Sequence, residues 1–123
     1  MPYDLASAEK YATHFGIHHC GNNMDRFSQF YGVLPKGNYY DIGYGSDVKK
    51  CVECFKIERI KQVLRGRFGP DRLLCGDIEE IQREIKRMVE SGVNCVACIG
   101  VDPLTLDKNI EALFQSVWRF GIL

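Results

Sequence analysis

The sequence predicts an α/β fold in which four consecutive strand–helix units form a single domain over residues 1–123. Short apolar runs alternate four times with stretches whose apolar residues recur every three or four positions. Runs that are apolar throughout are typical of strands in a parallel sheet covered on both faces. A complete (β/α)8 barrel, the TIM barrel, needs roughly 250 residues. Four units therefore correspond either to an open sheet or to half of such a barrel.

The first two units are expected in the N-terminal half of the chain. The first strand covers residues 13–20 and ends at Gly21, and its helix begins at Asn22 or Asn23, which are both good capping residues. The second strand covers residues 39–44. Its helix is capped by Ser46 or Asp47, and its apolar stripe extends to Val63.

The last two units follow Pro70, which we expect to lie beyond the end of the preceding helix. The third strand is the short run 72–75, which turns at Gly76. Residues 77–80 have the pattern of a capping box that opens an amphipathic helix ending before Gly92. The fourth strand covers residues 93–99, and the last helix runs from about 106 to 120.

The composition excludes several classes of function. The chain has 16 Lys and Arg against 16 Asp and Glu, and its pI is near 6.8. This balance gives no electrostatic argument for binding nucleic acid or an anionic membrane surface. The apolar runs are too short to span a bilayer, and the first ten residues do not resemble a signal peptide. We therefore expect a cytoplasmic protein.

Six cysteines form two C-x-x-C spacings, Cys51–Cys54 and Cys95–Cys98. A zinc ribbon is disfavoured because the gap between the pairs is about twice the usual spacing of roughly 15–20 residues. Residues three apart on a strand point to opposite faces, so Cys95 and Cys98 are not expected to share a metal. Cys51 joins the apolar face of the second helix, where a structural role is favoured. Cys75 is expected at the end of the third strand.

His18 and Cys20 share one face at the carboxyl end of the first expected strand, whereas His19 points the other way, towards a helix. Cys98 ends the fourth strand at the same level. Active sites of parallel α/β folds lie at this end of the strands. One imidazole and two thiolates suit zinc and leave a fourth position open. On spacing alone, however, the favoured interpretation is a core histidine beside a buried cysteine.

Residues 18–22, His-His-Cys-Gly-Asn between a strand and a helix, resemble a segment of the uroporphyrinogen decarboxylase-like superfamily. Within it, the branch of cobalamin-dependent methylcobamide:thiol methyltransferases is the most similar. Further similar segments occur in the same order, so that the resemblance extends over nearly the whole chain although each segment is short: 41–47, 74–78, 98–103 and 109–113.

The resemblance implies the C-terminal half of a (β/α)8 barrel and, in the methyltransferase branch, a catalytic zinc. Its ligands correspond to His18, Cys20 and Cys98. Zinc lowers the pKa of a bound thiol, so that a thiolate is available at neutral pH. That thiolate, of coenzyme M or a similar acceptor, would take a methyl group from a corrinoid carried on a partner protein. Asp102 is expected in a loop, where its carboxylate either supports the zinc or caps the last helix, and the cap is favoured.

Two alternatives stay open. One is a uroporphyrinogen decarboxylase-like protein without metal, although the N-terminal half with its substrate-gripping residues is missing and residues 98–103 contain no histidine. The other is a non-catalytic half barrel that completes its sheet with another chain, either as a homo-oligomer or with an N-terminal half.

Overall fold

The computed structural model describes residues 6–7, 9–10, 16–33, 39–56 and 63–121. Within these ranges, the strands are β1 (Gly16–His18), β2 (Tyr39–Asp41), β3 (Val63–Phe68) and β4 (Cys95–Cys98). The helices are α2 (Ser28–Tyr31), α3 (Val48–Phe55), α4 (Pro70–Cys75), α5 (Ile78–Glu90) and α6 (Asp107–Phe120).

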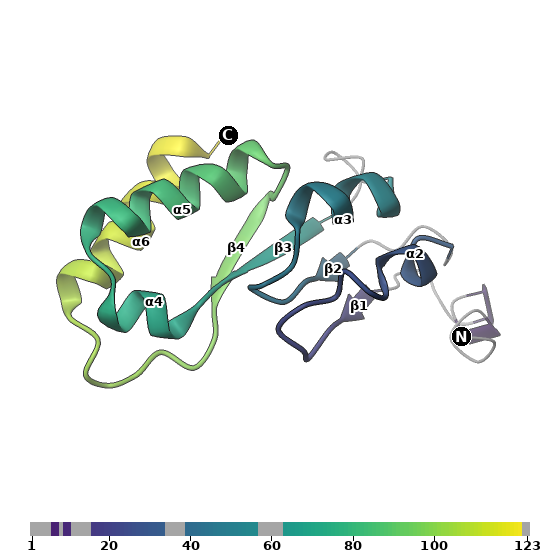
Figure 1. The fold of residues 1–123 in the computed structure, drawn as a ribbon, viewed down its shortest axis with the longest axis horizontal. Coiled ribbons are helices and arrows are strands. Elements are labelled where there is room, and N and C mark those ends of the chain that lie inside the picture. Colours follow the sequence, from purple (N-terminus) through teal and green to yellow (C-terminus); the bar gives the residue numbers. More distant parts are fainter. Residues whose placement is uncertain (1–5, 8, 11–15, 34–38, 57–62, 122–123) are drawn as a thin grey trace.

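The four strands form one sheet in the order β1-β2-β3-β4, and every neighbouring pair is parallel (Figure 1). The register places His18 beside Asp41 and Asp41 beside Arg65. Between β3 and β4 it places Phe68 beside Cys98. The prediction of a mixed α/β fold with a parallel sheet is confirmed.

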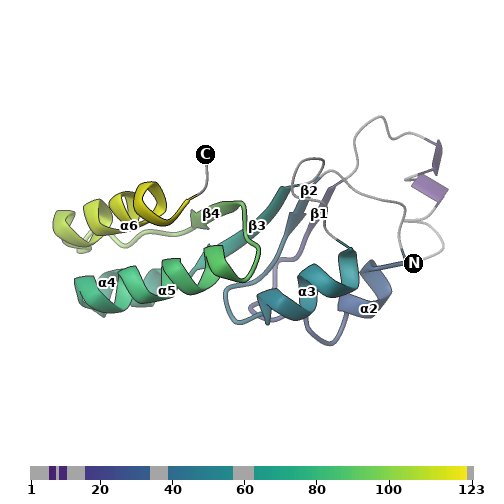
Figure 2. The same cartoon turned by 90° about the horizontal axis from the view of Figure 1, so that it is seen from above.

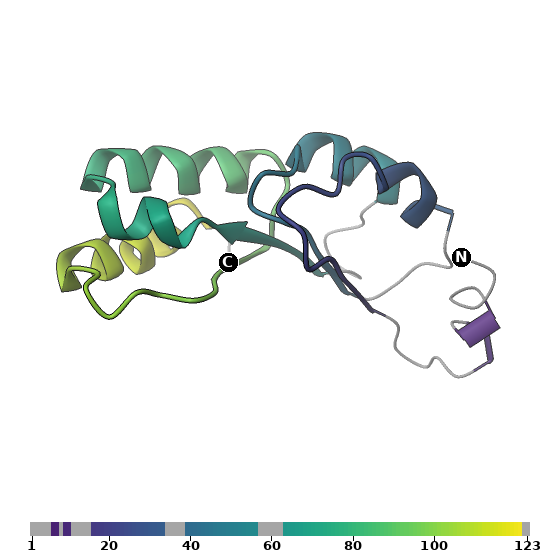
Figure 3. The same ribbon diagram turned by 60° about the horizontal axis from the view of Figure 1, so that its bottom comes forward.

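The hydrophobic core lies on one face of this sheet. Ile17, Tyr40, Leu64 and Phe68, at alternate positions of the first three strands, are all buried. They share a core with residues of the helices: Val48, Cys51, Phe55, Leu73, Ile81, Ile85 and Met88. Figure 3 shows α3 and α5 along the same side of the sheet, and Figure 2 shows α5 and α6 side by side at its β4 end.

The predicted helix starts at Asp47 and Asp77 are confirmed. The Asp47 side chain accepts a hydrogen bond from the Lys50 amide at 3.1 Å. Asp77 and Glu80 form the capping box of α5, with contacts of 2.8 and 3.2 Å between each side chain and the other residue's backbone amide. Both helices thus begin where a carboxylate satisfies amides of the first turn.

The prediction of a third strand at residues 72–75 is wrong. That segment belongs to α4, whose first residue is Pro70, and the strand is β3, earlier in the chain. Proline is well suited to the first turn of a helix because the amide it lacks has no partner there. Here Pro70 therefore starts a helix, and Cys75 ends α4 instead of a strand. Val63, expected on a helical stripe, begins β3 and is exposed.

The first helix is also shorter than predicted, since α2 begins only at Ser28. Asn23 accepts a hydrogen bond from the Asp25 amide at 2.8 Å and donates one to the Gly45 carbonyl at 2.9 Å. Side chains that bond the backbone two residues ahead hold a turn in place of a helix. None of the helices in the described part of the chain is long and apolar enough to cross a membrane.

Candidate functional site

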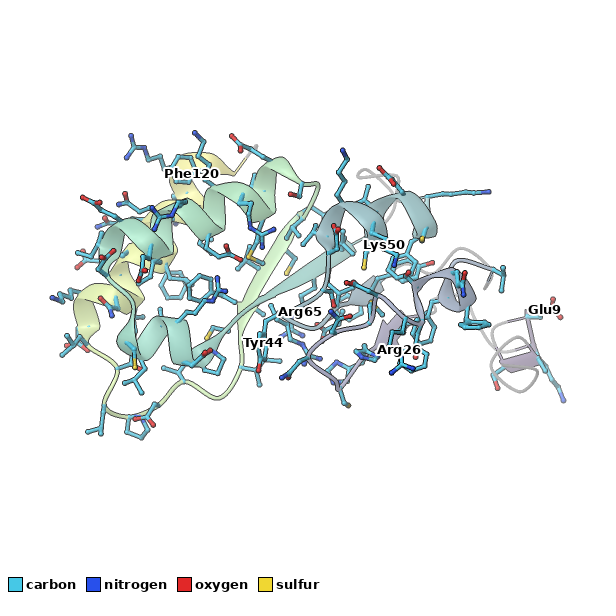
Figure 4. All side chains as sticks on the ribbon, viewed as in Figure 1. Glu9, Arg26, Tyr44, Lys50, Arg65 and Phe120 are labelled. Atoms are coloured by element: carbon cyan, nitrogen blue, oxygen red, sulfur yellow. The ribbon has the colours of Figure 1, made fainter. Side chains whose placement is uncertain are left out.

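Polar side chains from three neighbouring strands gather on the sheet face opposite the core. His18 is the last residue of β1, and Asp41 is the last residue of β2. Arg65 and Arg67 alternate with the buried residues of β3. Because side chains alternate between the two faces of a strand, these four share the face that the core does not use. Arg65 is labelled in this region in Figure 4.

Asp41 is the centre of this cluster, and its side chain is fully buried. Its Oδ1 atom accepts a hydrogen bond from Nε of Arg67 at 2.9 Å, and Oδ2 lies 2.5 Å from Nδ1 of His18. Nη1 of Arg65 lies 3.4 Å from Oδ2. Burial alone raises the pKa of Asp41, but hydrogen bonds from Arg67 and His18 and the charges of both arginines outweigh it and lower that pKa. Asp41 is therefore an ionised carboxylate at neutral pH.

Arg67 links the cluster to the loop after β1, and only 12% of its side chain is exposed. Its Nη2 atom donates to the His19 carbonyl at 2.7 Å. The same atom lies 3.1 and 3.2 Å from the two ring nitrogens of His18. Arg65 donates to the Tyr39 hydroxyl at 2.7 Å. Two guanidinium groups and one carboxylate leave the cluster with an excess of positive charge.

The loops after β1 and β2 are packed closely together, which positions the ends of both strands. The Ser46 hydroxyl accepts a hydrogen bond from the Met24 amide at 3.0 Å, and the Gly45 amide donates to the Asn22 carbonyl at 2.7 Å. A Cβ atom on Gly43 would lie only 2.2 Å from the Gly21 carbonyl oxygen. Only glycine permits this approach between the two loops.

The three predicted zinc ligands are not brought together. His18 belongs to the Asp41 cluster, and Cys20 is an exposed residue beyond the end of β1. Cys98 is the register partner of Phe68 and packs against the hydrophobic core, so it lies on the other face of the sheet from His18. Burial, followed by the charge of Asp71, raises the pKa of the Cys98 thiol and disfavours the thiolate that zinc requires.

These residues therefore do not fit a zinc ion in this arrangement. Among the residues that the structure describes, no group of three or more His, Cys, Asp or Glu side chains is placed to hold a metal. The Arg67 guanidinium beside His18 adds a positive charge that opposes a divalent cation there. Zinc at His18, Cys20 and Cys98 stays a prediction from the resemblance.

The other cysteines behave largely as the spacing predicts. Cys51 is fully buried in the core, and burial is the main cause that raises the pKa of its thiol to about 12. Cys95 pairs in register with Arg65 and Cys98 with Phe68, so the two lie on opposite faces. Cys75 is exposed.

Two further expectations have different outcomes. His19 does point towards a helix, since its ring lies 5.9 Å from that of Phe27 and 6.4 Å from that of Tyr31. Asp102, in contrast, does not cap the last helix. It accepts a hydrogen bond from the Leu104 amide at 2.8 Å and holds a loop turn, and α6 has no side-chain cap.

Sequence reasoning missed Asp41, Arg65 and Arg67 as site residues. A signal was present, because the two arginines are two positions apart and alternate with Leu64 and Phe68. A period of two identifies a strand with one polar face.

Comparison of the chain with protein-family models, with curated proteins and with solved structures finds no match. The geometry of the Asp41 cluster therefore carries the argument about function.

Proposed function

We propose that this chain is the C-terminal half of a uroporphyrinogen decarboxylase-like barrel and that it binds a polycarboxylated tetrapyrrole without a metal. The supporting observation is the Asp41 cluster, which presents two arginines and a histidine near the carboxyl ends of β1, β2 and β3. Substrates of parallel α/β folds bind at these ends. In a closed barrel the face opposite the helices is the inside, so the cluster would line the substrate site.

The charge of the cluster favours a ligand with carboxylates. Arginine binds carboxylate groups through paired N–H donors, and it stays charged at every pH of interest. The carboxylate of Asp41 is already shared by both arginines and His18. The excess positive charge is therefore available to a ligand.

Zinc-dependent methyl transfer to a thiol, from a corrinoid on a partner protein, is the second candidate. The observation that favours it is the Asp41 contact with Nδ1 of His18, because metal-ligating histidines usually have a carboxylate on the other ring nitrogen. This candidate needs a third ligand in addition to His18 and Cys20, and Cys98 faces the core.

Completion of the barrel is part of the proposal. Among the described strands, β1 and β4 are the two edges of the sheet. A second copy of the chain or an N-terminal half would supply the missing strands. Light scattering distinguishes the two, because a monomer in solution would exclude self-pairing.

Titration with uroporphyrin, a stable polycarboxylated porphyrin, tests the proposed function. We expect the Soret absorbance to shift in the presence of a chelator and the dissociation constant to be unchanged by Cys98→Ala. Cys75→Ala, at an exposed cysteine, is the matched control. Absence of porphyrin binding by the wild type overturns the proposal. Zinc at about one ion per chain that is lost in Cys98→Ala would favour the second candidate.

A further inference from the structure

We infer that Arg67 and Arg65 form a metal-independent oxyanion subsite, which holds a carboxylate or another oxyanion of similar charge against the open face of the sheet. That the bound oxyanion is one carboxylate of a larger ligand rests on the proposed function. The chemistry of the subsite rests on the two guanidinium groups and can be tested separately.

The first support is the set of hydrogen-bond donors that remains open. A guanidinium has five N–H donors. Among the described residues, the hydrogen bonds of Arg67 use Nε and Nη2, and those of Arg65 use Nη1. Nη1 of Arg67 and both Nε and Nη2 of Arg65 therefore have no hydrogen-bond partner in the described part of the chain, and a ligand could use them. Parallel N–H donors are the arrangement that suits the oxygens of an oxyanion.

The second support is that the guanidinium groups are already held in place. Asp41 contacts both arginines, the His19 carbonyl anchors Arg67, and the Tyr39 hydroxyl anchors Arg65. The side chain of Arg67 is 12% exposed and that of Arg65 is 26% exposed. Ligand binding would therefore cost little free energy for ordering the two arginine side chains. Their partial burial also strengthens the attraction between the guanidinium groups and an anion.

The third support is the charge of this face. The register places Gly16, Tyr39, Cys95 and Ala97 on the same side as the cluster, and none of them is an aspartate or a glutamate. Asp41 is thus the one carboxylate against two guanidinium groups among the described residues of the strands on this face. The excess of positive charge would therefore attract an anion to this site.

The position of the Arg67 guanidinium also explains why the predicted zinc site does not fit. Nη2 of Arg67 lies within 3.2 Å of both ring nitrogens of His18. A metal ion bound to His18 would need one of these nitrogens for itself. The cation beside His18 is therefore the guanidinium of Arg67. The site attracts anions directly, without a metal in between.

Inorganic sulfate in the presence of a chelator is the first probe. We expect it to shift the Nε resonances of Arg65 and Arg67 in ¹⁵N-labelled protein along a saturable curve. Arg65→Gln should weaken this binding by about tenfold, because it removes one of the two charges. Arg83→Gln, on the solvent side of α5, is the matched control and should bind as the wild type does. Shifts that do not saturate, or an unchanged affinity in Arg65→Gln, overturn the inference.

Uroporphyrin then separates the inference from the proposed function. We expect Arg65→Gln and Arg67→Lys to weaken porphyrin binding, with thermal unfolding as the check that each variant is folded. Folded variants that bind the porphyrin with wild-type affinity overturn the subsite and leave the proposed function standing. Saturable sulfate binding without porphyrin binding would support the oxyanion subsite and overturn the proposed function.

Discussion

Nδ1 of His18 lies 2.5 Å from Oδ2 of Asp41, and the two residues are register partners at the ends of adjacent parallel strands. His18 is half exposed, whereas the side chain of Asp41 is fully buried. The contact therefore connects a residue that a ligand can reach with a carboxylate that it cannot. Asp41 contacts both His18 and Arg67, so the positions of these two side chains depend on one carboxylate.

Replacing Asp41 by Asn should destabilise the protein strongly. The change keeps the shape of the side chain but leaves Arg67, which is 12% exposed, without its ionic partner. Breaking a buried ion pair in this way costs about 3–5 kcal/mol. Urea unfolding should show this loss in Asp41→Asn and a change below about 0.5 kcal/mol in Asp107→Asn, an exposed position of α6. A wild-type free energy of unfolding for Asp41→Asn would show that the ion pair is not important for stability.

Glu84 should contribute stability that depends on pH. It accepts two hydrogen bonds from Arg87, at 2.6 and 3.0 Å, and these are the main cause that lowers its pKa below the ordinary value of 4.5; burial opposes them. Because the folded-state pKa is lowered, this contribution is fully present above the unfolded-state pKa and is lost as the pH falls through the folded-state pKa. Glu84→Gln should lower the free energy of unfolding by about 0.5–1 kcal/mol at pH 7.

Chemical denaturation as a function of pH measures this difference. The curves of the wild type and Glu84→Gln should separate above pH 4.5 and converge at lower pH. Glu79→Gln, an exposed residue in the first turn of the same helix, is the control and should give a smaller separation. A constant difference at every pH would mean that the ionised form of Glu84 is not the stabilising species.

The elements that could be predicted from the sequence are those whose signals are local. The capping box of α5 requires only Asp77, Glu80 and the amides between them, so residue type and spacing are sufficient. The third strand was misplaced because the signals at its border conflict. Pro70 predicts the end of a helix, whereas it starts one, and the arginines of β3 make the strand less apolar than its neighbours.

The candidate site is less predictable because it depends on strand register. Asp41 and Arg67 are 26 positions apart in the chain and meet only because β2 and β3 pair in one particular alignment. A shift of one residue in a strand would turn its side chains to the other face. The same dependence on register affects Cys98. Its place at the end of β4 is predicted correctly, but it lies on the other face of the sheet from His18, which the sequence does not predict.

Asn109 should stabilise the junction between α6 and the α4–α5 turn. Its buried side-chain amide donates to the Leu73 carbonyl at 2.9 Å and to the Gly76 carbonyl at 3.0 Å. Asn109→Ala leaves both carbonyls without this donor and should cost about 1–3 kcal/mol. Amide exchange should also become faster at the end of α4. Gln115→Ala, which removes one exposed hydrogen bond to Glu111, is the control, and an equal loss in both variants would contradict the role of Asn109.

Gly66 should tolerate substitution less well than Gly100. A Cβ atom on Gly66 would lie 2.5 Å from Cε of Met88 and 2.9 Å from Cγ2 of Val93, so these two side chains would have to move. Overpacking of this kind costs about 1–3 kcal/mol. A Cβ atom on Gly100 would meet nothing within 4 Å, but its φ of +75° costs a side chain about 1 kcal/mol. Urea unfolding of Gly66→Ala and Gly100→Ala measures both losses.

The cause of the Gly66 effect can be isolated with a second substitution. Met88→Ala removes the Cε atom that the new methyl group would meet. Gly66→Ala should therefore destabilise the Met88→Ala variant by less than it destabilises the wild type, and the double-mutant cycle should be non-additive by about 0.5–3 kcal/mol. Gly100→Ala in the same background should be additive, because nothing lies within 4 Å of its Cβ position. Additive losses for Gly66 and Met88 would mean that the clash is not with Met88, and Val93 would then be the residue that limits the space at Gly66.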